Sequence, residues 1–298
     1  MGSIENLHQN EAVLLATALV DYVAASAKIE VLFIKGPGST MMGLRENHLS
    51  ADVDVLVRPQ HLNRIVELLG NRGWLERPSG VSVVRRYEHS RTLYHPQWNS
   101  DIDVHDRFPG MEAPPESSFQ TLWRDRQYLV LAGRIAPVPS TSAAVIFQAL
   151  HSLRAMNDPR HQREYTGLIQ RVPVTMHKEI RDLSEELQAT AALKPFLDDL
   201  GLEDRPTGTE TVSEEWRHRT SVQGTGTAYL IALMESPWQA KPRVLARAIV
   251  PSRNTLRERN LHLDDTVAGL IRAHLARWRR GLAGLPAAAR KAGPSRRR

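Results

Sequence analysis

The pattern of hydrophobic and polar positions predicts alternating helices and strands in the first part of the chain. Residues Asn10 to Ala27 place apolar side chains three and four positions apart, as an amphipathic helix does. The apolar run from Val31 to Ile34 predicts a strand, and a second strand is expected from Ala51 to Val57. A short helix is expected to begin near Ser39, between the two strands, and another helix from Gln60 to Leu69.

Further strand-like segments follow the second helix. Val81 to Tyr87 and Arg91 to His95 have the pattern of a β-hairpin, and Asp101 to His105 predicts one more strand. The order helix, strand, helix, strand, helix, hairpin, strand indicates an α/β or α+β sandwich of roughly 100 to 130 residues. We expect an α+β fold in which helices flank a mixed β-sheet.

The pattern becomes helical after Pro139. Ser140, Thr141 and Ser142 cap an apolar helix from Ala143 to Leu153, and Glu179 to Ala192 and Leu263 to Arg279 are further expected helices. Gly201 to Thr227 has little periodicity and predicts a long surface loop. We therefore expect an α/β domain over residues 1–135, a helical domain over 136–280 with a long loop near 201–227, and a basic, disordered tail over 281–298.

The charge of the chain is concentrated at its C-terminal end. The net charge is +6, yet residues Ala273 to Arg298 contain seven Arg and one Lys and no acid, so the remaining residues carry −2. This distribution is typical of a solvated tail, and it argues against a basic, folded nucleic-acid-binding surface. The tail leaves salt-sensitive attraction to RNA or another polyanion open.

The composition also limits the chemistry and the location. The chain contains no cysteine, which excludes disulfides, thiolate metal sites and cysteine nucleophiles. The first residues do not show a basic region followed by an apolar run, and no stretch has the roughly 18 to 20 apolar residues of a membrane span. We expect a cytoplasmic protein that does not enter a membrane.

Acidic residues at alternate positions mark two of the predicted strands. Asp52 and Asp54 point to the same face of their strand because side chains alternate with period two. Asp101, Asp103 and His105 share one face of the later strand in the same way. Adjacent carboxylates repel unless a cation lies between them, and Mg²⁺ is typically held by one or two carboxylates together with substrate phosphates. The acids are expected to converge on one metal site.

These motifs and their order resemble the polymerase-beta-like nucleotidyltransferase superfamily. Within it, Ile34-Lys35-Gly36, the strand Ser50-Ala51-Asp52-Val53-Asp54 and the later Ile102-Asp103-Val104-His105 are similar to a largely uncharacterised bacterial nucleotidyltransferase family. That family typically has a Lys-Gly turn, a Ser-Asp-x-Asp strand and an Asp-Leu-His strand. The resemblance covers roughly residues 10 to 160 and is weaker in the helical remainder.

The resemblance implies roles for the acidic residues. Asp52 and Asp54 would hold two Mg²⁺ ions, one with the triphosphate and one that lowers the pKa of the attacking hydroxyl. Asp103 would be the third carboxylate, as a metal ligand or as the acceptor of the nucleophile's proton, and Asp101 is the competing candidate. His105 would orient substrate, support Asp103 or serve only the structure.

The turn after the first strand is the expected phosphate site. Gly36, Gly38 and Ser39 would contact the triphosphate through the turn and the start of the next helix, and Lys35 would neutralise its charge. The wider superfamily has adjacent Gly-Gly or Gly-Ser here, whereas Pro37 separates the two glycines of this chain. Further candidate anion contacts at strand or helix ends are Arg45, Arg58 and Arg107.

Other catalytic motifs are not found in the sequence. His151 and His161 lack metal-ligand spacing with a suitable third ligand, and Glu164 adds none. There is no P-loop, and Ser39 has no nearby base that would indicate a hydrolase triad. Arg163-Glu164-Tyr165 stands where the resembled family tends to have an Arg/Trp-rich segment with an aspartate, which predicts different substrate recognition.

The sequence thus predicts an enzyme that uses an NTP and Mg²⁺ or Mn²⁺. It would transfer a nucleoside monophosphate to an acceptor hydroxyl or phosphate and release pyrophosphate, with a small molecule or peptide favoured as the acceptor. A toxin-like enzyme that modifies tRNA is the alternative, and a non-catalytic nucleotide-binding protein of the same fold is another. The sequence does not predict the oligomeric state.

Overall fold

The computed structural model describes residues 8–46, 50–77, 89–202 and 212–221, and scattered positions between 233 and 279. Packing divides the chain into two compact units, residues 1–78 with 87–220 and residues 79–86 with 221–298. In the second unit, the described positions of the expected helix Leu263 to Arg279 are helical, which confirms the prediction at those positions. Within the described residues, no helix is long and apolar enough to cross a membrane.

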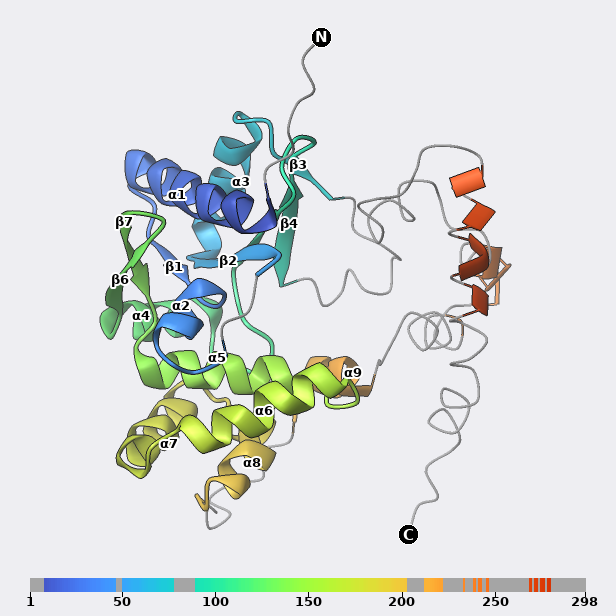
Figure 1. Ribbon diagram of the computed structural model, residues 1–298. Helices are drawn as coiled ribbons and strands as arrows, with labels where there is room; N and C mark the ends of the chain where they lie inside the picture. The colour runs from blue at the N-terminus through green and yellow to red at the C-terminus, as the bar shows by residue number, and fades with distance from the viewer. Residues whose placement is uncertain are drawn as a thin grey trace. The chain divides into compact units, whose positions relative to one another are not determined.

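A five-stranded mixed sheet organises the first unit (Figure 1). Its strands lie in the order β1-β2-β5-β4-β3, and their bounds are β1 Val31–Phe33, β2 Asp52–Val57, β3 Leu75–Glu76, β4 Ser90–Tyr94 and β5 Asp101–His105. β2 and β5 pair in parallel and the other neighbours are antiparallel. The parallel register places Asp52 opposite Asp101 and Asp54 opposite Asp103. The mixed sheet with its helices confirms the expected α+β fold.

Two helices cover the apolar face of the sheet (Figure 1). They are α1 (Gln9–Ala27) and α3 (Leu62–Gly70), which follows the short 3-10 turn η1 (Pro59–His61). Alternation along the strands directs one set of buried side chains into this layer: Val31, Phe33, Val53, Val55, Val57, Ile102 and Val104. The helices predicted at Asn10 to Ala27 and Gln60 to Leu69 are thus confirmed, with small differences at their ends.

The opposite face of the sheet is partly apolar and partly acidic. Leu32 and Leu56 join a second core cluster with Phe108 and Phe147, while Asp54 and Asp103 occupy the neighbouring positions. Phe119 and Leu122 of α4 (Pro115–Arg124) belong to this core, and the short helix α2 (Pro37–Met41) follows β1. The hairpin of β6 (Gln127–Leu131) and β7 (Arg134–Val138) packs instead in the layer of α1 and α3, through Leu131, Ala136 and Val138. The acidic side chains therefore border a well-packed core.

Helices from the second half of the described chain complete this core (Figure 1). They are α5 (Thr141–Leu153), α6 (Pro159–Arg171), α7 (His177–Glu186), α8 (Thr190–Asp199) and α9 (Glu214–Ser221), with a 3-10 turn η3 (Val174–Met176) before α7. The Ser140 hydroxyl accepts a hydrogen bond from the backbone N–H of Ala143 and caps α5, as predicted. These helices up to α9 lie in the same compact unit as the sheet, and a separate helical domain from residue 136 stays a prediction.

Two sequence predictions about the helical part are wrong. The helix expected from Glu179 to Ala192 is two helices, because the chain between α7 and α8 turns at Gln188, which has a φ of +50°. The loop expected over Gly201 to Thr227 contains α9. The Ser213 hydroxyl accepts a hydrogen bond from the backbone N–H of Trp216, and the Trp216 side chain is buried, so a cap and one aromatic anchor stabilise a helix in a polar segment.

The predicted hairpin is only partly within the described residues. Its second strand is confirmed as β4, whereas Val81 to Tyr87 lies outside the described residues. In the structure, the antiparallel partner of β4 is β3, which pairs Leu75 with Tyr94 and Glu76 with Leu93. The short helix expected near Ser39 begins earlier, because Pro37 takes the first helical position of α2.

Candidate active site

The acidic residues of β2 and β5 lie together because the two strands are parallel neighbours. Asp54 is opposite Asp103 in the ladder, and Asp52 is opposite Asp101. Neighbouring strands are only about 4.8 Å apart, so carboxylates on one face at opposed positions interact strongly. The fold thus brings Asp52, Asp54 and Asp103 near one another on one face of the sheet, and metal binding by all three stays a prediction.

Asp54 is the most tightly held of these carboxylates. One of its oxygens, Oδ1, lies 2.6 Å from Lys35 Nζ and 3.0 Å from His105 Nε2. Burial alone would raise the pKa of Asp54, but the Lys35 ammonium and the His105 hydrogen bond hold it well below its usual range. Asp54 is therefore ionised, and the Lys35 ammonium compensates the charge of this carboxylate.

Asp103 has one carboxylate oxygen that accepts no hydrogen bond within the described residues. This oxygen, Oδ1, is buried, although the Thr92 hydroxyl donates a hydrogen bond to the carboxylate. Burial and repulsion from Asp54 raise the pKa of Asp103 against the opposing effect of His105. Nδ1 of His105 is likewise buried and has no partner in the described part of the chain. Buried polar atoms are normally paired, so these two indicate room for a ligand.

Asp101 and Asp52 are in different surroundings from Asp54 and Asp103. The Arg77 guanidinium donates two hydrogen bonds to Asp101, at 3.0 Å from Nε and 2.7 Å from Nη2, and lies over the Tyr94 ring. Asp101 is thus engaged in a bidentate ion pair. Burial and repulsion from Asp54 raise the pKa of Asp52 to about 7, so near neutral pH the Asp52 carboxyl is only partly ionised.

The ring of His105 is enclosed by aromatic groups. Its centroid lies 5.3 Å from that of His89 and 6.0 Å from that of Phe108. His89 Nδ1 lies 2.9 Å from Arg219 Nη2 of α9, and burial lowers the pKa of His89 strongly. The sequence analysis considered His105 as a support for Asp103, but its hydrogen bond is to Asp54.

The Gly-Pro-Gly turn joins β1 to α2 beside Asp54. Gly36 has a φ of +63°, which favours glycine, and a Cβ there would lie 3.1 Å from Ser50 Oγ. Gly38 and Ser39 are buried within the short α2, and a Cβ on Gly38 would contact Val138. The turn is therefore closely packed, and contacts of Gly36, Gly38 and Ser39 with phosphate stay a prediction.

Of the three arginines considered as anion contacts, two are in structural ion pairs. Arg58 pairs with Glu30 and Glu116 and lies over the Phe119 ring. Arg107 pairs with Glu215. Arg45 differs, because its buried Nη2 has no hydrogen-bond partner within the described ranges and lies 4.0 Å from a Glu164 oxygen. Arg45 also interacts electrostatically with Asp52 and Asp54.

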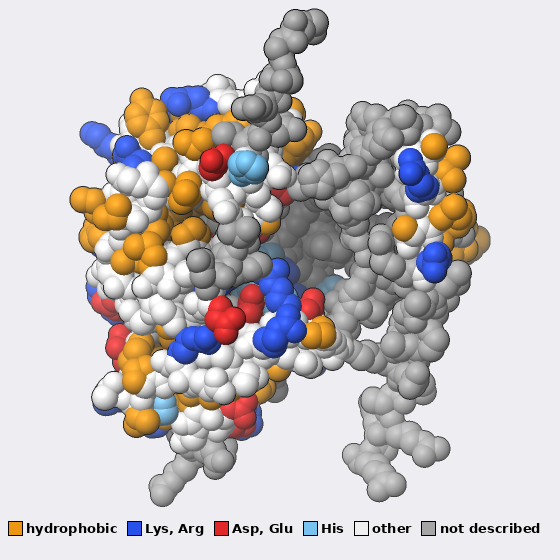
Figure 2. Space-filling model, viewed as in Figure 1, with side chains coloured by type: hydrophobic (Ala, Val, Ile, Leu, Met, Phe, Trp, Pro, Cys, Tyr) orange, Lys and Arg blue, Asp and Glu red, His pale blue; other side chains and the backbone are white. Residues whose placement is uncertain are grey.

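A second arginine near the carboxylates was missed by the sequence analysis. Arg154, at the C-terminal end of α5, interacts with Asp54 and Asp103. Burial and the nearby Arg219 lower its pKa to about 10. No motif in the sequence marks this residue, because only the packing of α5 against the sheet brings it to the acids. Figure 2 shows basic and acidic side chains together over the part of this unit where α6 lies.

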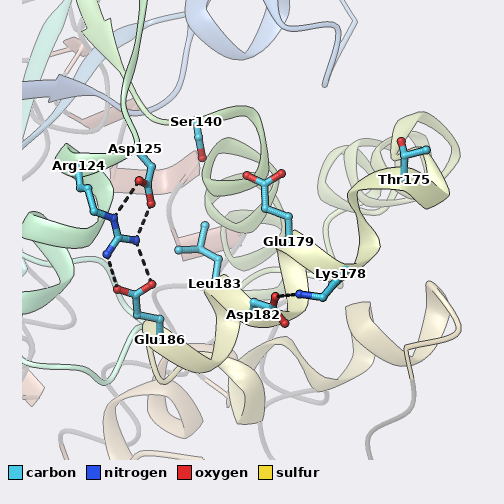
Figure 3. Close-up of a pocket in the computed structure, with 9 residues that line it drawn as sticks. All are labelled: Arg124, Asp125, Ser140, Thr175, Lys178, Glu179, Asp182, Leu183 and Glu186. Atoms are coloured by element: carbon cyan, nitrogen blue, oxygen red, sulfur yellow. Dashed lines mark hydrogen bonds and ion pairs between the residues drawn. The ribbon is translucent and has the colours of Figure 1, made fainter.

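A surface pocket elsewhere has a different character (Figure 3). It is lined by residues of α4, α7 and the segments that precede α5 and α7, including Arg124, Asp125, Glu179, Asp182 and Glu186. Arg124 forms ion pairs with Asp125 at 2.6 Å and with Glu186 at 3.1 Å, and Lys178 pairs with Asp182 at 2.6 Å. These charges satisfy one another, so the carboxylate group on the sheet remains the stronger candidate site.

The carboxylate group has a donor set that fits a divalent cation. Asp54, Asp103 and His105 each offer one ligand atom, and these atoms lie within 4.8 Å of one another. Asp52 is outside this group of three, although it repels Asp54. The unpaired Asp103 Oδ1 and His105 Nδ1 are consistent with a bound cation. Two carboxylates and one imidazole are an oxygen-rich set that suits Mg²⁺ or Mn²⁺.

Comparison with known proteins shows the family of the chain. A family model described as "Uncharacterised nucleotidyltransferase" matches residues 3–194. The match covers well over half of the chain, and it includes β1, β2 and β5 with their acidic residues. The chain therefore belongs to this family of nucleotidyltransferases, which confirms the resemblance found in the sequence.

The solved structures similar to the chain are distant. One is a lincomycin-bound lincosamide antibiotic adenylyltransferase, LnuA, with 17% identity over 61% of this chain and 99% of that chain, at a TM-score of 0.34. Another is an antigenic nucleotidyltransferase-like protein from Paracoccidioides brasiliensis, with 15% identity over 67% and 96% of the two chains, at 0.40. The antibiotic-resistance factor ANT(2'')-Ia has 11% identity over 64% and 96%, at 0.38. A comparison with curated proteins gave no match.

Proposed function

We propose that the protein is a metal-dependent nucleotidyltransferase that moves a nucleoside monophosphate from an NTP to an acceptor hydroxyl or phosphate and releases pyrophosphate. The observation that carries this proposal is the position of Asp54 and Asp103 side by side on parallel strands. Within the described residues, one Asp103 oxygen is buried without a hydrogen-bond partner, and Arg154 interacts electrostatically with both carboxylates. Family membership supports the same reaction class.

The metal would be held by Asp54 and Asp103, with Asp52 and His105 beside them. A divalent cation, Mg²⁺ or Mn²⁺, supplies charge neutralisation for the triphosphate and lowers the pKa of the attacking hydroxyl when it is bound. Of the two candidates for the third carboxylate we favour Asp103, because Asp101 is already occupied by Arg77.

The residues of the chain itself have separate roles in this proposal. Asp54 is kept ionised by Lys35 and His105 and can ligate a cation without first losing a proton. Lys35, whose Nζ lies 2.6 Å from Asp54, would supply positive charge for a triphosphate bound near the Gly36 turn. Arg45 and Arg154 supply further positive charge beside the carboxylates, where they stabilise the negative charge that develops on the transferring phosphoryl group.

The acceptor is proposed to be a small molecule or a peptide. The residues before Ala273 carry a net charge of −2, which does not favour a nucleic-acid surface. A tRNA-modifying enzyme is the alternative, and it would use the basic segment 281–298, which lies outside the described residues. The absence of cysteine is in keeping with a cytoplasmic location, which we include in the proposal.

The test is transfer of label from each α-³²P-NTP in the presence of Mg²⁺ or Mn²⁺ and fractionated cell extract. Wild-type protein should label a small-molecule or peptide fraction, and Asp52→Ala/Asp54→Ala should label none. Label in the RNA fraction would support the tRNA alternative instead. If no fraction is labelled and calorimetry detects metal-dependent NTP binding, the protein is a non-catalytic nucleotide binder; without that binding, the carboxylate group has no nucleotide role.

A further inference from the structure

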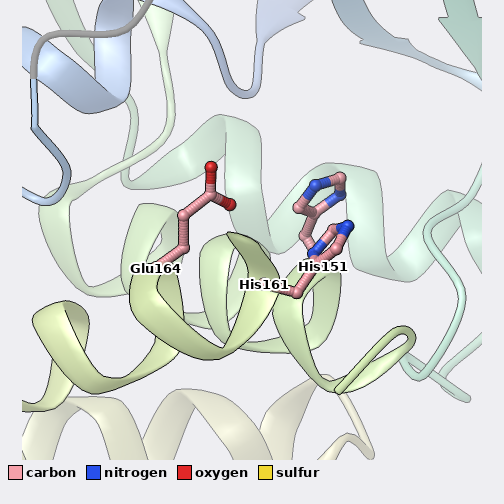
Figure 4. A group of neighbouring side chains, drawn as sticks. All are labelled: His151, His161 and Glu164. Carbon is pink, nitrogen blue, oxygen red and sulfur yellow. The ribbon is translucent and has the colours of Figure 1, made fainter. Parts of the chain in front are cut away.

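A second group of metal-ligating side chains lies on the helices, apart from the strand carboxylates. It consists of His151 on α5 and His161 and Glu164 on α6 (Figure 4). One ligand atom from each residue lies within 4.8 Å of the others, and the two imidazole ring centroids are 4.9 Å apart. The sequence predicts no third ligand for these histidines and no contribution from Glu164, whereas the structure brings a ligand atom of Glu164 within 4.8 Å of theirs.

The helical geometry explains how the group forms. His161 and Glu164 are three residues apart on α6, so they project from the same helix face. That face packs along α5, which contributes His151 near its C-terminal end. Asp158 accepts a hydrogen bond from the backbone N–H of Arg160 and caps α6, which sets the point where the helix begins. The three ligands therefore come from two rigid elements.

Both histidines are in the chemical state that metal ligation requires. Burial lowers the pKa of His151 well below its ordinary value, with further lowering by Lys35 and Arg154. Burial also lowers the pKa of His161. A neutral imidazole has a lone pair for a metal, whereas an imidazolium has none. Nδ1 of His161 is buried and has no hydrogen-bond partner within the described residues, which is unusual for a buried polar atom.

The other members of the group have existing partners. Oε1 of Glu164 accepts from Arg160 at 3.1 Å, and Oε2 accepts from Gln148 at 3.3 Å. A carboxylate has about four acceptor positions, so these bonds leave it able to ligate a cation. His151 is different, because Arg154 Nη2 lies 2.8 Å from its Nδ1. A neutral imidazole has a single lone pair, and donation from Arg154 occupies it.

We propose that His151, His161 and Glu164 form a site for a transition-metal dication of the Zn²⁺ class. Two imidazoles and one carboxylate are the donor set of three-ligand zinc sites, and they favour Zn²⁺ over the hard Mg²⁺ that suits the strand carboxylates. Metal ligation by His151 and its hydrogen bond with Arg154 exclude each other. Binding therefore releases Arg154, the same guanidinium that interacts with Asp54 and Asp103. This inference does not depend on nucleotidyl transfer.

The test uses Co²⁺, whose visible absorption reports its ligands, with the full-length, chelator-treated protein. The background is Asp54→Asn/Asp103→Asn, which removes the strand carboxylates as a competing site. We expect binding of one Co²⁺ per chain with intense absorption bands, and displacement of the Co²⁺ by equimolar Zn²⁺. His161→Ala and Glu164→Gln should abolish these bands. His177→Ala, a histidine of α7 outside the group, should leave them unchanged.

Arg154→Met is a second test, in which Co²⁺ binding should become tighter and not weaker. Loss of the competing charged hydrogen bond should tighten Co²⁺ binding by about tenfold or more, the equivalent of about 1.4 kcal/mol. Circular dichroism would check that each variant is folded. The proposal is overturned if no Co²⁺ binds in the background protein, if His161→Ala binds Co²⁺ with unchanged bands, or if Arg154→Met does not tighten binding.

Discussion

The two faces of the β2–β5 ladder have opposite chemistry although the same two strands form both. On one face, Val53, Val55, Ile102 and Val104 are buried beneath α1 and α3. On the other face, the Asp54, Asp103 and His105 side chains gather with partly unsatisfied polar atoms. Because side chains alternate along a strand, stability and chemistry are separated at the level of single neighbouring residues.

The separation also explains why the acidic face can be tolerated. Burial, together with repulsion from Asp54, raises the pKa of Asp52 and Asp103, which is unfavourable for the ionised folded state. The apolar face supplies the burial that offsets this cost, at about 25 cal/mol per Å² of apolar surface. Substitutions at adjacent positions of β5 should therefore have different consequences on the two faces.

The largest effect is expected from Asp103→Asn. If the acidic face performs the transfer, loss of this carboxylate should lower the rate of label transfer by at least about 10³-fold, because metal-assisted charge stabilisation contributes several kcal/mol. The thermal unfolding midpoint should stay the same or rise, since repulsion from Asp54 is relieved. Initial rates and thermal melts measure both. A variant that keeps a tenth of the wild-type rate would remove Asp103 from the chemistry.

The neighbouring residue should show the opposite behaviour. Ile102 is fully buried on the apolar face, so Ile102→Ala should lower the free energy of unfolding by about 2 to 5 kcal/mol through lost burial and a cavity. The rate per folded molecule should change little. Urea unfolding with parallel rate measurements below the transition would check this. A loss of rate without a loss of stability would show that the two faces are not separate.

The pH dependence of stability sharpens the same comparison. The pKa of Asp52 is about 7 in the folded protein and about 4 in an unfolded chain. The folded state thus holds a proton that the unfolded state has lost between these values, so the free energy of unfolding falls as the pH rises from about 4 through 7. In metal-free protein, Asp52→Asn should reduce the decrease between pH 5 and pH 8 by about 1 to 2 kcal/mol, after allowance for solvent screening.

Urea unfolding at the two pH values, with a chelator present, would measure this decrease. Asp182→Asn, in an exposed ion pair on α7, is the matched control and should leave the decrease unchanged. An equal decrease in wild type and Asp52→Asn would show that Asp52 has an ordinary pKa in the folded protein.

The smallest effect is expected at Asp101, next to Ile102 on the acidic side. Asp101 is partly exposed and paired with Arg77, so Asp101→Asn should change the free energy of unfolding by less than about 1 kcal/mol. Metal-dependent NTP binding should stay within about threefold of wild type, the equivalent of roughly 0.6 kcal/mol. Calorimetry would measure the binding. A strong loss would mean that Asp101, and not Asp103, is the third carboxylate.

Much of the candidate site could be predicted from local sequence patterns. Period-two alternation predicted that Asp52 and Asp54 share a face, and that Asp101, Asp103 and His105 do. The structure agrees, since alternation is a property of any strand. What alternation could not supply is the partner of each acid. Arg77 is distant in sequence from Asp101 and takes that carboxylate, whereas the partners of Asp54 are Lys35 and His105.

The group of His151, His161 and Glu164 shows more clearly what local sequence patterns cannot predict. His161 and Glu164 have a spacing that places them on one helix face, but His151 is ten positions earlier, before a helix break. A search for ligand spacing along the chain therefore missed the group. Its formation depends on how α5 and α6 pack, which is decided by the burial of Leu150 and Leu168 in the shared core.

The sequence by itself determined the elements whose pattern is periodic: α1, β1, β2, β5 and the start of α5, together with the family to which the chain belongs. These follow from local alternation, capping and motif order. Only the tertiary structure decided that β5 is the parallel neighbour of β2, that Arg154 lies near the carboxylates, and that two helices bring His151, His161 and Glu164 together. Such contacts join residues far apart in sequence, and their energy comes from burial of a common core, which no local pattern contains.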